Sequence, residues 1–93
     1  MTNIARKYFV SGDVQGVGFR YFAQRLAAAH QVRGYVRNLN DGRVEALAIG
    51  SEKAVEAFRH DLAAGPKYSR VQHIEELVID PAEEAYSSFR IEH

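Results

Sequence analysis

The sequence contains no cysteine among its 93 residues. This absence excludes a disulfide framework, a thiolate nucleophile and any metal site that depends on sulfur. It also excludes phosphatase mechanisms that proceed through a phosphorylated cysteine. The sequence lacks a long apolar run as well: none approaches the roughly 20 residues of a membrane span, and the first residues show no secretory signal peptide. We expect a cytoplasmic protein that does not bind membranes.

The sequence also has no net charge, since twelve basic side chains balance twelve acidic ones. The charges are unevenly placed: residues 1–43 carry seven bases and two acids, and residues 44–93 carry five bases and ten acids. A basic first half agrees with an anionic ligand, although the two halves can also fold together so that the surface charge averages out. The length suits one hydrophobic core, and we expect a single domain over residues 1–93.

A segment rich in glycine lies between an apolar run and a helical pattern. Residues 12–20 read Gly-Asp-Val-Gln-Gly-Val-Gly-Phe-Arg. The run from Tyr8 to Val10 is typical of a strand end, and the apolar residues after Gly18 recur at helical spacing. Three glycines in seven residues permit positive φ, so backbone N–H groups can converge where the helix begins. The pattern predicts an anion site beside Arg20, although a tight turn and a solvent-exposed arginine would look the same.

The rest of the chain predicts alternating strands and helices. We expect strands at 35–39, 43–49 and 70–79, and a short edge strand at 89–92. Ser51 is the expected N-cap of a second helix, which Gly65 and Pro66 end. With the right-handed crossover rule, this β-α-β-β-α-β order predicts an α+β, ferredoxin-like split β-α-β sandwich. Its sheet is mostly antiparallel, with two helices on one face and a short C-terminal edge strand.

The residue sets for metal and phosphoenzyme catalysis are missing. No Gly-Lys-Ser/Thr sequence forms a nucleoside-triphosphate loop, and no acidic pair before a helix offers an aspartyl nucleophile. The histidines have no spacing typical of metal ligands, so we treat them as structural or surface residues. They are His30, His60, His73 and His93. We therefore expect neither a metal nor a cofactor.

The segment from Gly12 to Arg20 resembles the signature loop of the acylphosphatases. Residues 34–39 and 41–45 resemble the second motif of that family, and residues 65–71 and 89–91 fit its later pattern. The resemblance covers nearly the whole chain. It implies a ferredoxin-like fold and an enzyme that hydrolyses acyl phosphates to a carboxylate and inorganic phosphate. It also implies a phosphate-binding loop that comprises Gln15, Gly16, Val17, Gly18, Phe19 and Arg20.

The same resemblance implies roles for two side chains. Arg20 would be the catalytic arginine that binds phosphate, and Asn38 would orient the attacking water. Composition alone would favour Asn38 as a turn residue before residues 40–42. The carboxylate leaving group of an acyl phosphate is a weak base, so positioning and charge stabilisation should suffice without a strong general acid. We expect in-line attack by water, with inorganic phosphate and sulfate as competing anions.

Other functions share part of this pattern. A ferredoxin-like nucleic-acid or ligand-binding module has the same element order, and RNA-recognition domains stack bases on aromatic side chains of the sheet. Tyr8 or Phe9 could serve in that way, but the expected strand at 43–49 has no aromatic residue and the chain is not basic. A ferredoxin-like metal carrier would need cysteine. The loop also occurs in hydrogenase-maturation carbamoyltransferases, but we expect a free-standing monomer that acts on a small acyl phosphate.

Overall fold

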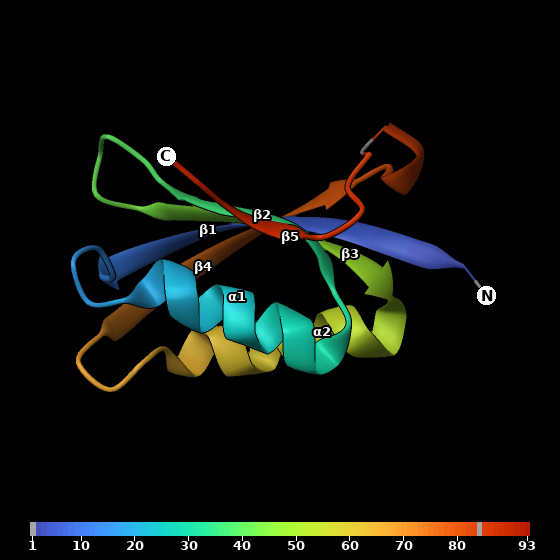
Figure 1. Ribbon diagram of the computed structural model, residues 1–93. Helices are drawn as coiled ribbons and strands as arrows, with labels where there is room; N and C mark the ends of the chain where they lie inside the picture. The colour runs from blue at the N-terminus through green and yellow to red at the C-terminus, as the bar shows by residue number, and fades with distance from the viewer. Residues whose placement is uncertain (1, 84) are drawn as a thin grey trace.

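Two helices cover one face of a five-stranded sheet in the computed structural model of the chain, which describes residues 2–83 and 85–93 (Figure 1). The strands are β1 (Asn3–Asp13), β2 (Arg33–Asn38), β3 (Val44–Ser51), β4 (Arg70–Ile79) and β5 (Phe89–Glu92). The helices are α1 (Phe19–His30) and α2 (Glu52–Ala64), and a 3-10 turn, η1 (Pro81–Glu83), precedes β5.

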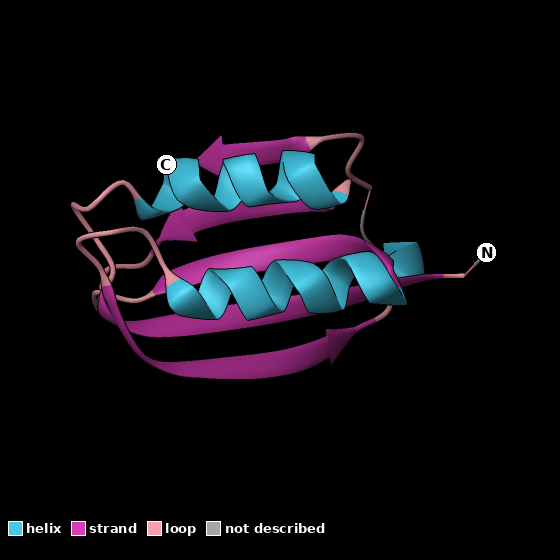
Figure 2. Cartoon of the chain, turned by 90° about the horizontal axis from the view of Figure 1, so that it is seen from below, coloured by secondary structure: helices cyan, strands magenta, loops and turns pink. Residues whose placement is uncertain are grey.

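The strand order across the sheet is β4-β1-β3-β2-β5. Neighbouring strands are antiparallel except β2 and β5, which are parallel. Figure 2, which views the molecule from the helix side, shows the two helices side by side in front of these strands. The predicted ferredoxin-like fold is confirmed, including the short edge strand near the C-terminus. In the described part of the chain, no helix is long and apolar enough to cross a membrane.

The main core lies between the helices and the sheet. On β3, Val44, Ala46 and Ala48 face this core, whereas Leu47 and Ile49 belong to a smaller cluster on the opposite face. This alternation follows from strand geometry, because successive side chains of a strand point to opposite faces. The helices contribute fully or almost fully buried side chains, namely Phe19, Ala23, Ala27, Val55, Phe58 and Leu62.

Local signals set the ends of α2 as predicted. The Ser51 hydroxyl accepts a hydrogen bond of 3.1 Å from the backbone N–H of Ala54, which makes Ser51 the N-cap. Gly65 follows the last turn with φ of 69°, a conformation that favours glycine. The strand limits are less well predicted. β2 begins at Arg33 rather than residue 35, because pairing with Ile49 extends the ladder beyond the apolar run.

A charged cluster lies on the sheet face opposite the helices. Glu45 is only 4% exposed, and its carboxylate accepts a hydrogen bond from the Tyr35 hydroxyl and another of 3.2 Å from Arg37 Nη2. Lys7 Nζ lies 3.9 Å from the same carboxylate. A buried carboxylate needs such partners, because an unpaired charge is costly away from water. The cluster ties β1, β3 and β2 together near the end of β2.

Alkaline pH should destabilise the fold through two buried phenols. Burial raises the pKa of Tyr8 to about 12, and burial, followed by the hydrogen bond to Glu45, also raises the pKa of Tyr35. An unfolded tyrosine has a pKa of about 10. The folded state therefore favours the neutral phenols, and this stabilisation is complete below pH 10 and is lost as the pH rises toward 12. Urea unfolding between pH 8 and 11.5 should show that the free energy of unfolding falls as the pH rises. The fall should be smaller for Tyr8→Phe than for the wild type. Equal losses would contradict the role of Tyr8.

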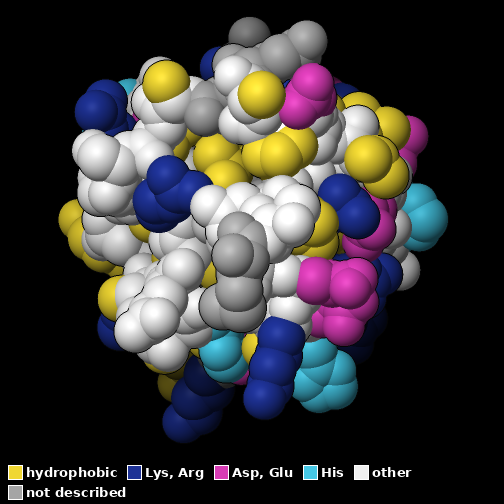
Figure 3. All heavy atoms as spheres, turned by 90° about the vertical axis from the view of Figure 1, so that its right-hand side faces the viewer, with side chains coloured by type: hydrophobic (Ala, Val, Ile, Leu, Met, Phe, Trp, Pro, Cys, Tyr) yellow, Lys and Arg dark blue, Asp and Glu magenta, His cyan; other side chains and the backbone are white. Residues whose placement is uncertain are grey.

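Three segments distant in sequence meet at one end of the sheet. In Figure 1, the β1–α1 connection, the β2–β3 turn and the C-terminal end of β5 all lie at the left. Figure 3 shows the opposite end of the molecule, where basic, acidic and hydrophobic side chains are intermixed on the visible face. The glycine-rich segment between β1 and α1 therefore lies at the same end of the molecule as the β2–β3 turn and the end of β5.

Candidate active site

The glycine loop (residues 12–18) joins the end of β1 to the start of α1. At Gly12 an added Cβ would lie 2.1 Å from the backbone oxygen of Arg70, so glycine is required where β1 passes β4. Gly18 precedes α1 in the left-handed conformation, with φ of 79°, and no side chain caps the helix. No hydrogen bond among the described residues uses the backbone N–H groups of residues 16–21. The loop therefore presents free donors at a helix N-terminus, an arrangement that suits an anion.

Gln15 and Val17 support the glycine loop and do not line the cavity beside it. Gln15 Nε2 donates hydrogen bonds of 2.7 Å to the backbone oxygen of Leu39 and 2.9 Å to that of Arg43. These bonds tie the loop to the β2–β3 turn, directly after Asn38. Val17 is partly buried against the main core. Both residues belong to the predicted phosphate-binding loop, and neither is among the described residues that line the cavity.

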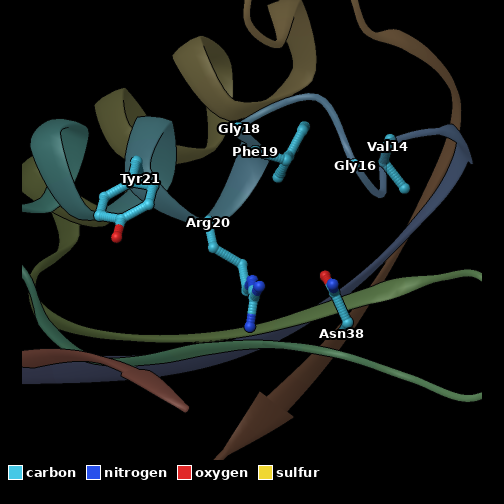
Figure 4. Close-up of a pocket in the computed structure, with 7 residues that line it drawn as sticks. All are labelled: Val14, Gly16, Gly18, Phe19, Arg20, Tyr21 and Asn38. Atoms are coloured by element: carbon cyan, nitrogen blue, oxygen red, sulfur yellow. The ribbon is translucent and has the colours of Figure 1, made fainter. Parts of the chain in front are cut away.

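A cavity of about 180 Å³ lies between the glycine loop, the first turn of α1 and the end of β2 (Figure 4). In Figure 4 the Arg20 side chain extends from the helix and the Asn38 side chain from β2, and the two tips approach each other. These residues are 18 positions apart in the sequence, and the packing of α1 on the sheet brings them together. Of the predicted site residues, Gly16, Gly18, Phe19, Arg20 and Asn38 line the cavity, together with the unpredicted Val14 and Tyr21.

The end of β5 orients the Arg20 guanidinium. Arg20 Nη1 lies 3.1 Å from Nδ1 of His93 and 3.5 Å from the backbone oxygen of Glu92. His93 is exposed, in agreement with its prediction as a structural or surface residue, but its contact with Arg20 was not predicted. No local pattern could have revealed it, because it depends on β5 lying parallel to β2 at the sheet edge.

No carboxylate of the described residues pairs with the Arg20 guanidinium. Within the described residues, Arg20 makes no ion pair, and the first turn of α1 contains no acidic residue. An arginine at this end opposes the helix dipole, an arrangement that a bound anion would make favourable. The planar guanidinium offers paired donors that match phosphate oxygens. Residues 2–83 and 85–93 contain no cluster of three or more histidine, aspartate or glutamate side chains placed to hold a metal.

Comparison with known proteins agrees with this geometry. The family model for acylphosphatase matches residues 6–91. The chain belongs to the acylphosphatase family. An acylphosphatase from Solibacter usitatus is 47% identical over 87 residues, which are 94% of this chain and 88% of that protein. The crystal structure of acylphosphatase from Bacillus subtilis has a TM-score of 0.92 at 38% identity, and the match covers 97% of this chain and 99% of that one.

The acylphosphatase fold also occurs within a much longer chain. The crystal structure of full-length HypF in its phosphate- and nucleotide-bound form has a TM-score of 0.86 at 28% identity. That match covers 99% of this chain but only 12% of the HypF chain. The match to the Bacillus subtilis acylphosphatase instead extends over nearly the full length of both chains.

Proposed function

We propose that this member of the acylphosphatase family hydrolyses acyl phosphates, with Arg20 and Asn38 acting on the phosphoryl group and on the attacking water. The observation that carries the proposal is the convergence in one cavity of an unbalanced guanidinium, free backbone N–H groups and a carboxamide. These groups can bind an anion and orient a water beside it. The products are a carboxylate and inorganic phosphate.

The glycine loop and Arg20 hold the phosphoryl group in this mechanism. Backbone N–H groups near Gly16 and Gly18 donate to its oxygens, and the Arg20 guanidinium donates from the side nearer the sheet. Each of these donors is in place before the substrate arrives, so little reorganisation is needed as charge develops in the transition state. The contact with His93 restricts the orientations of Arg20 and so helps to keep its donors in position.

Asn38 orients the water. Its side-chain oxygen accepts a hydrogen bond from the water, whose oxygen attacks phosphorus in line with the leaving group. A bond forms between the water oxygen and phosphorus, and the bond between phosphorus and the acyl oxygen breaks. The carboxylate leaves with the electron pair of that bond, and a phosphate oxygen of the substrate takes the proton of the water. Neither metal nor phosphoenzyme takes part in the proposed reaction.

The leaving group limits the substrates. The alkoxide of a simple phosphate monoester needs protonation, and no carboxylate or histidine is among the described residues that line the cavity. The purified chain should therefore hydrolyse benzoyl phosphate but not glycerol phosphate, in the presence of excess chelator. Rapid turnover of glycerol phosphate, or loss of benzoyl phosphate hydrolysis on chelation, would overturn the proposed mechanism.

Inorganic phosphate and sulfate should stabilise the folded chain, because each fills the anion site and partly neutralises Arg20. At about 100 times the dissociation constant, binding to the folded state alone contributes roughly 2.7 kcal/mol. Thermal unfolding in increasing phosphate, at ionic strength matched with chloride, should show a rising midpoint. The same phosphate should compete with benzoyl phosphate. An unchanged midpoint at saturating phosphate would argue against the site.

The remaining expectations concern the state of the chain. The cavity draws its lining from the glycine loop, α1 and β2 of one chain, which supports a monomer formed by a single domain over residues 1–93. We propose that this monomer acts in the cytoplasm, on a small molecule and not on nucleic acid. Sedimentation at micromolar concentration should give the mass of one chain.

A further inference from the structure

Tyr21 is a large exposed side chain at the edge of the cavity. Tyr21 is among the residues that line the cavity, and the residue is 67% exposed. Its neighbours Phe19 and Phe22 instead contact each other, with ring centroids 5.9 Å apart, and Phe19 is buried. Within the described residues, no hydrogen bond, ring contact or cation–π contact involves the Tyr21 side chain. The Tyr21 ring is therefore available to a ligand.

The position of Tyr21 relative to Asn38 defines which part of a substrate it would meet. In Figure 4, Asn38 and Val14 lie on one side of Arg20, and Tyr21 lies on the other. In-line displacement places the leaving group opposite the attacking water across phosphorus. Because the proposed function puts the water at Asn38, the acyl group leaves on the side away from Asn38, where Tyr21 lies.

We propose that Tyr21 is a specificity residue whose ring contacts the acyl group and favours aromatic acyl phosphates over acetyl phosphate. This inference rests on the proposed function. An aromatic ring attracts another ring in offset or edge-to-face geometry and also shields its apolar surface from water. An acetyl group has one methyl and gains little from the same contact. An exposed tyrosine on a helix carries no signal of its own in the sequence, so this contact is not predictable from the sequence alone.

The test is the ratio of kcat/KM for benzoyl phosphate to kcat/KM for acetyl phosphate. We expect Tyr21→Ala to lower this ratio about tenfold, in keeping with the loss of one ring contact and its buried area. Tyr21→Phe should retain the ratio, because the ring and not the hydroxyl makes the contact. The matched control is Tyr68→Ala, since Tyr68 is 78% exposed and is not among the residues that line the cavity. A ratio within twofold of the wild-type value in Tyr21→Ala would overturn the inference.

A binding measurement separates this inference from the proposed function. Benzylphosphonate and methylphosphonate carry a large and a small apolar group on a phosphorus anion that is not hydrolysed. Both dissociation constants can be measured by thermal shift. We expect Tyr21→Ala to weaken the binding of benzylphosphonate about tenfold relative to the binding of methylphosphonate. This result would support the ring contact even if the chain hydrolysed neither acyl phosphate. Hydrolysis of both substrates, with equal losses of affinity for both phosphonates, would contradict the role of Tyr21 and leave the proposed function intact.

Discussion

Arg20→Ala is expected to lower kcat/KM for benzoyl phosphate by about 10³ or more, and to weaken inhibition by inorganic phosphate. Removing one preorganised donor from a catalytic site typically costs about 10² to 10³ in rate. Arg20 combines such a donor with the positive charge that faces the anion, and among the described residues no other cationic side chain lines the cavity. The measurements are kcat, KM and the phosphate inhibition constant.

Arg20→Lys separates the charge of this residue from its shape. Lysine keeps the positive charge but lacks the planar fork that donates two parallel hydrogen bonds. We expect intermediate turnover and weaker phosphate inhibition than in the wild type. Arg25→Ala is the control, because Arg25 is an exposed arginine on the same helix and is not among the residues that line the cavity. Wild-type phosphate affinity in Arg20→Lys would refute bidentate binding, and circular dichroism would establish that each variant folds.

Asn38→Ala should impair turnover without impairing anion binding. If the carboxamide only orients the water, its loss should lower kcat about 10²-fold or more while the phosphate inhibition constant stays nearly unchanged. Inorganic phosphate needs the loop and Arg20 but no attacking water. Kinetics with benzoyl phosphate and phosphate inhibition of the same preparation give both numbers.

Two further variants sharpen the Asn38 result. Asn40→Ala removes an exposed asparagine from the adjacent turn and should retain wild-type kinetics, which controls for effects of the turn. Asn38→Asp keeps the shape but places a negative charge beside the phosphoryl group, so it should weaken phosphate binding as well as turnover. Wild-type kcat in Asn38→Ala would mean that the water is held by another group.

The sequence predicts the fold well because glycine, proline and capping residues mark where its elements end. Ser51 and Gly65 bound α2 as their types require, and the alternation along β3 places its apolar residues on the correct faces. The buried position of Glu45 was not foreseen, since it depends on partners that β1 and β2 supply. The observed limits of the strands differ from the predicted ones where strand pairing, and not the side-chain pattern, decides where a strand begins.

The candidate site was predicted only in part from the residues themselves. Glycine spacing before the helix indicated the loop and an anion site beside Arg20, whereas the role of Asn38 came from the resemblance to the acylphosphatases. The contact of Arg20 with His93 and the place of Tyr21 at the cavity edge were missed. Each arises from how α1, β2 and β5 pack together, and no spacing within one element encodes it.

The central claim is that water attacks phosphorus in a site that needs no metal. Hydrolysis of benzoyl phosphate in ¹⁸O-labelled water, with excess chelator and mass analysis of both products, tests it most directly. The proposed mechanism predicts undiminished turnover, with one ¹⁸O atom incorporated into inorganic phosphate and none into benzoate. Label in benzoate would show attack at the carbonyl carbon, and loss of turnover on chelation would show that a metal is required. Either result would contradict the mechanism.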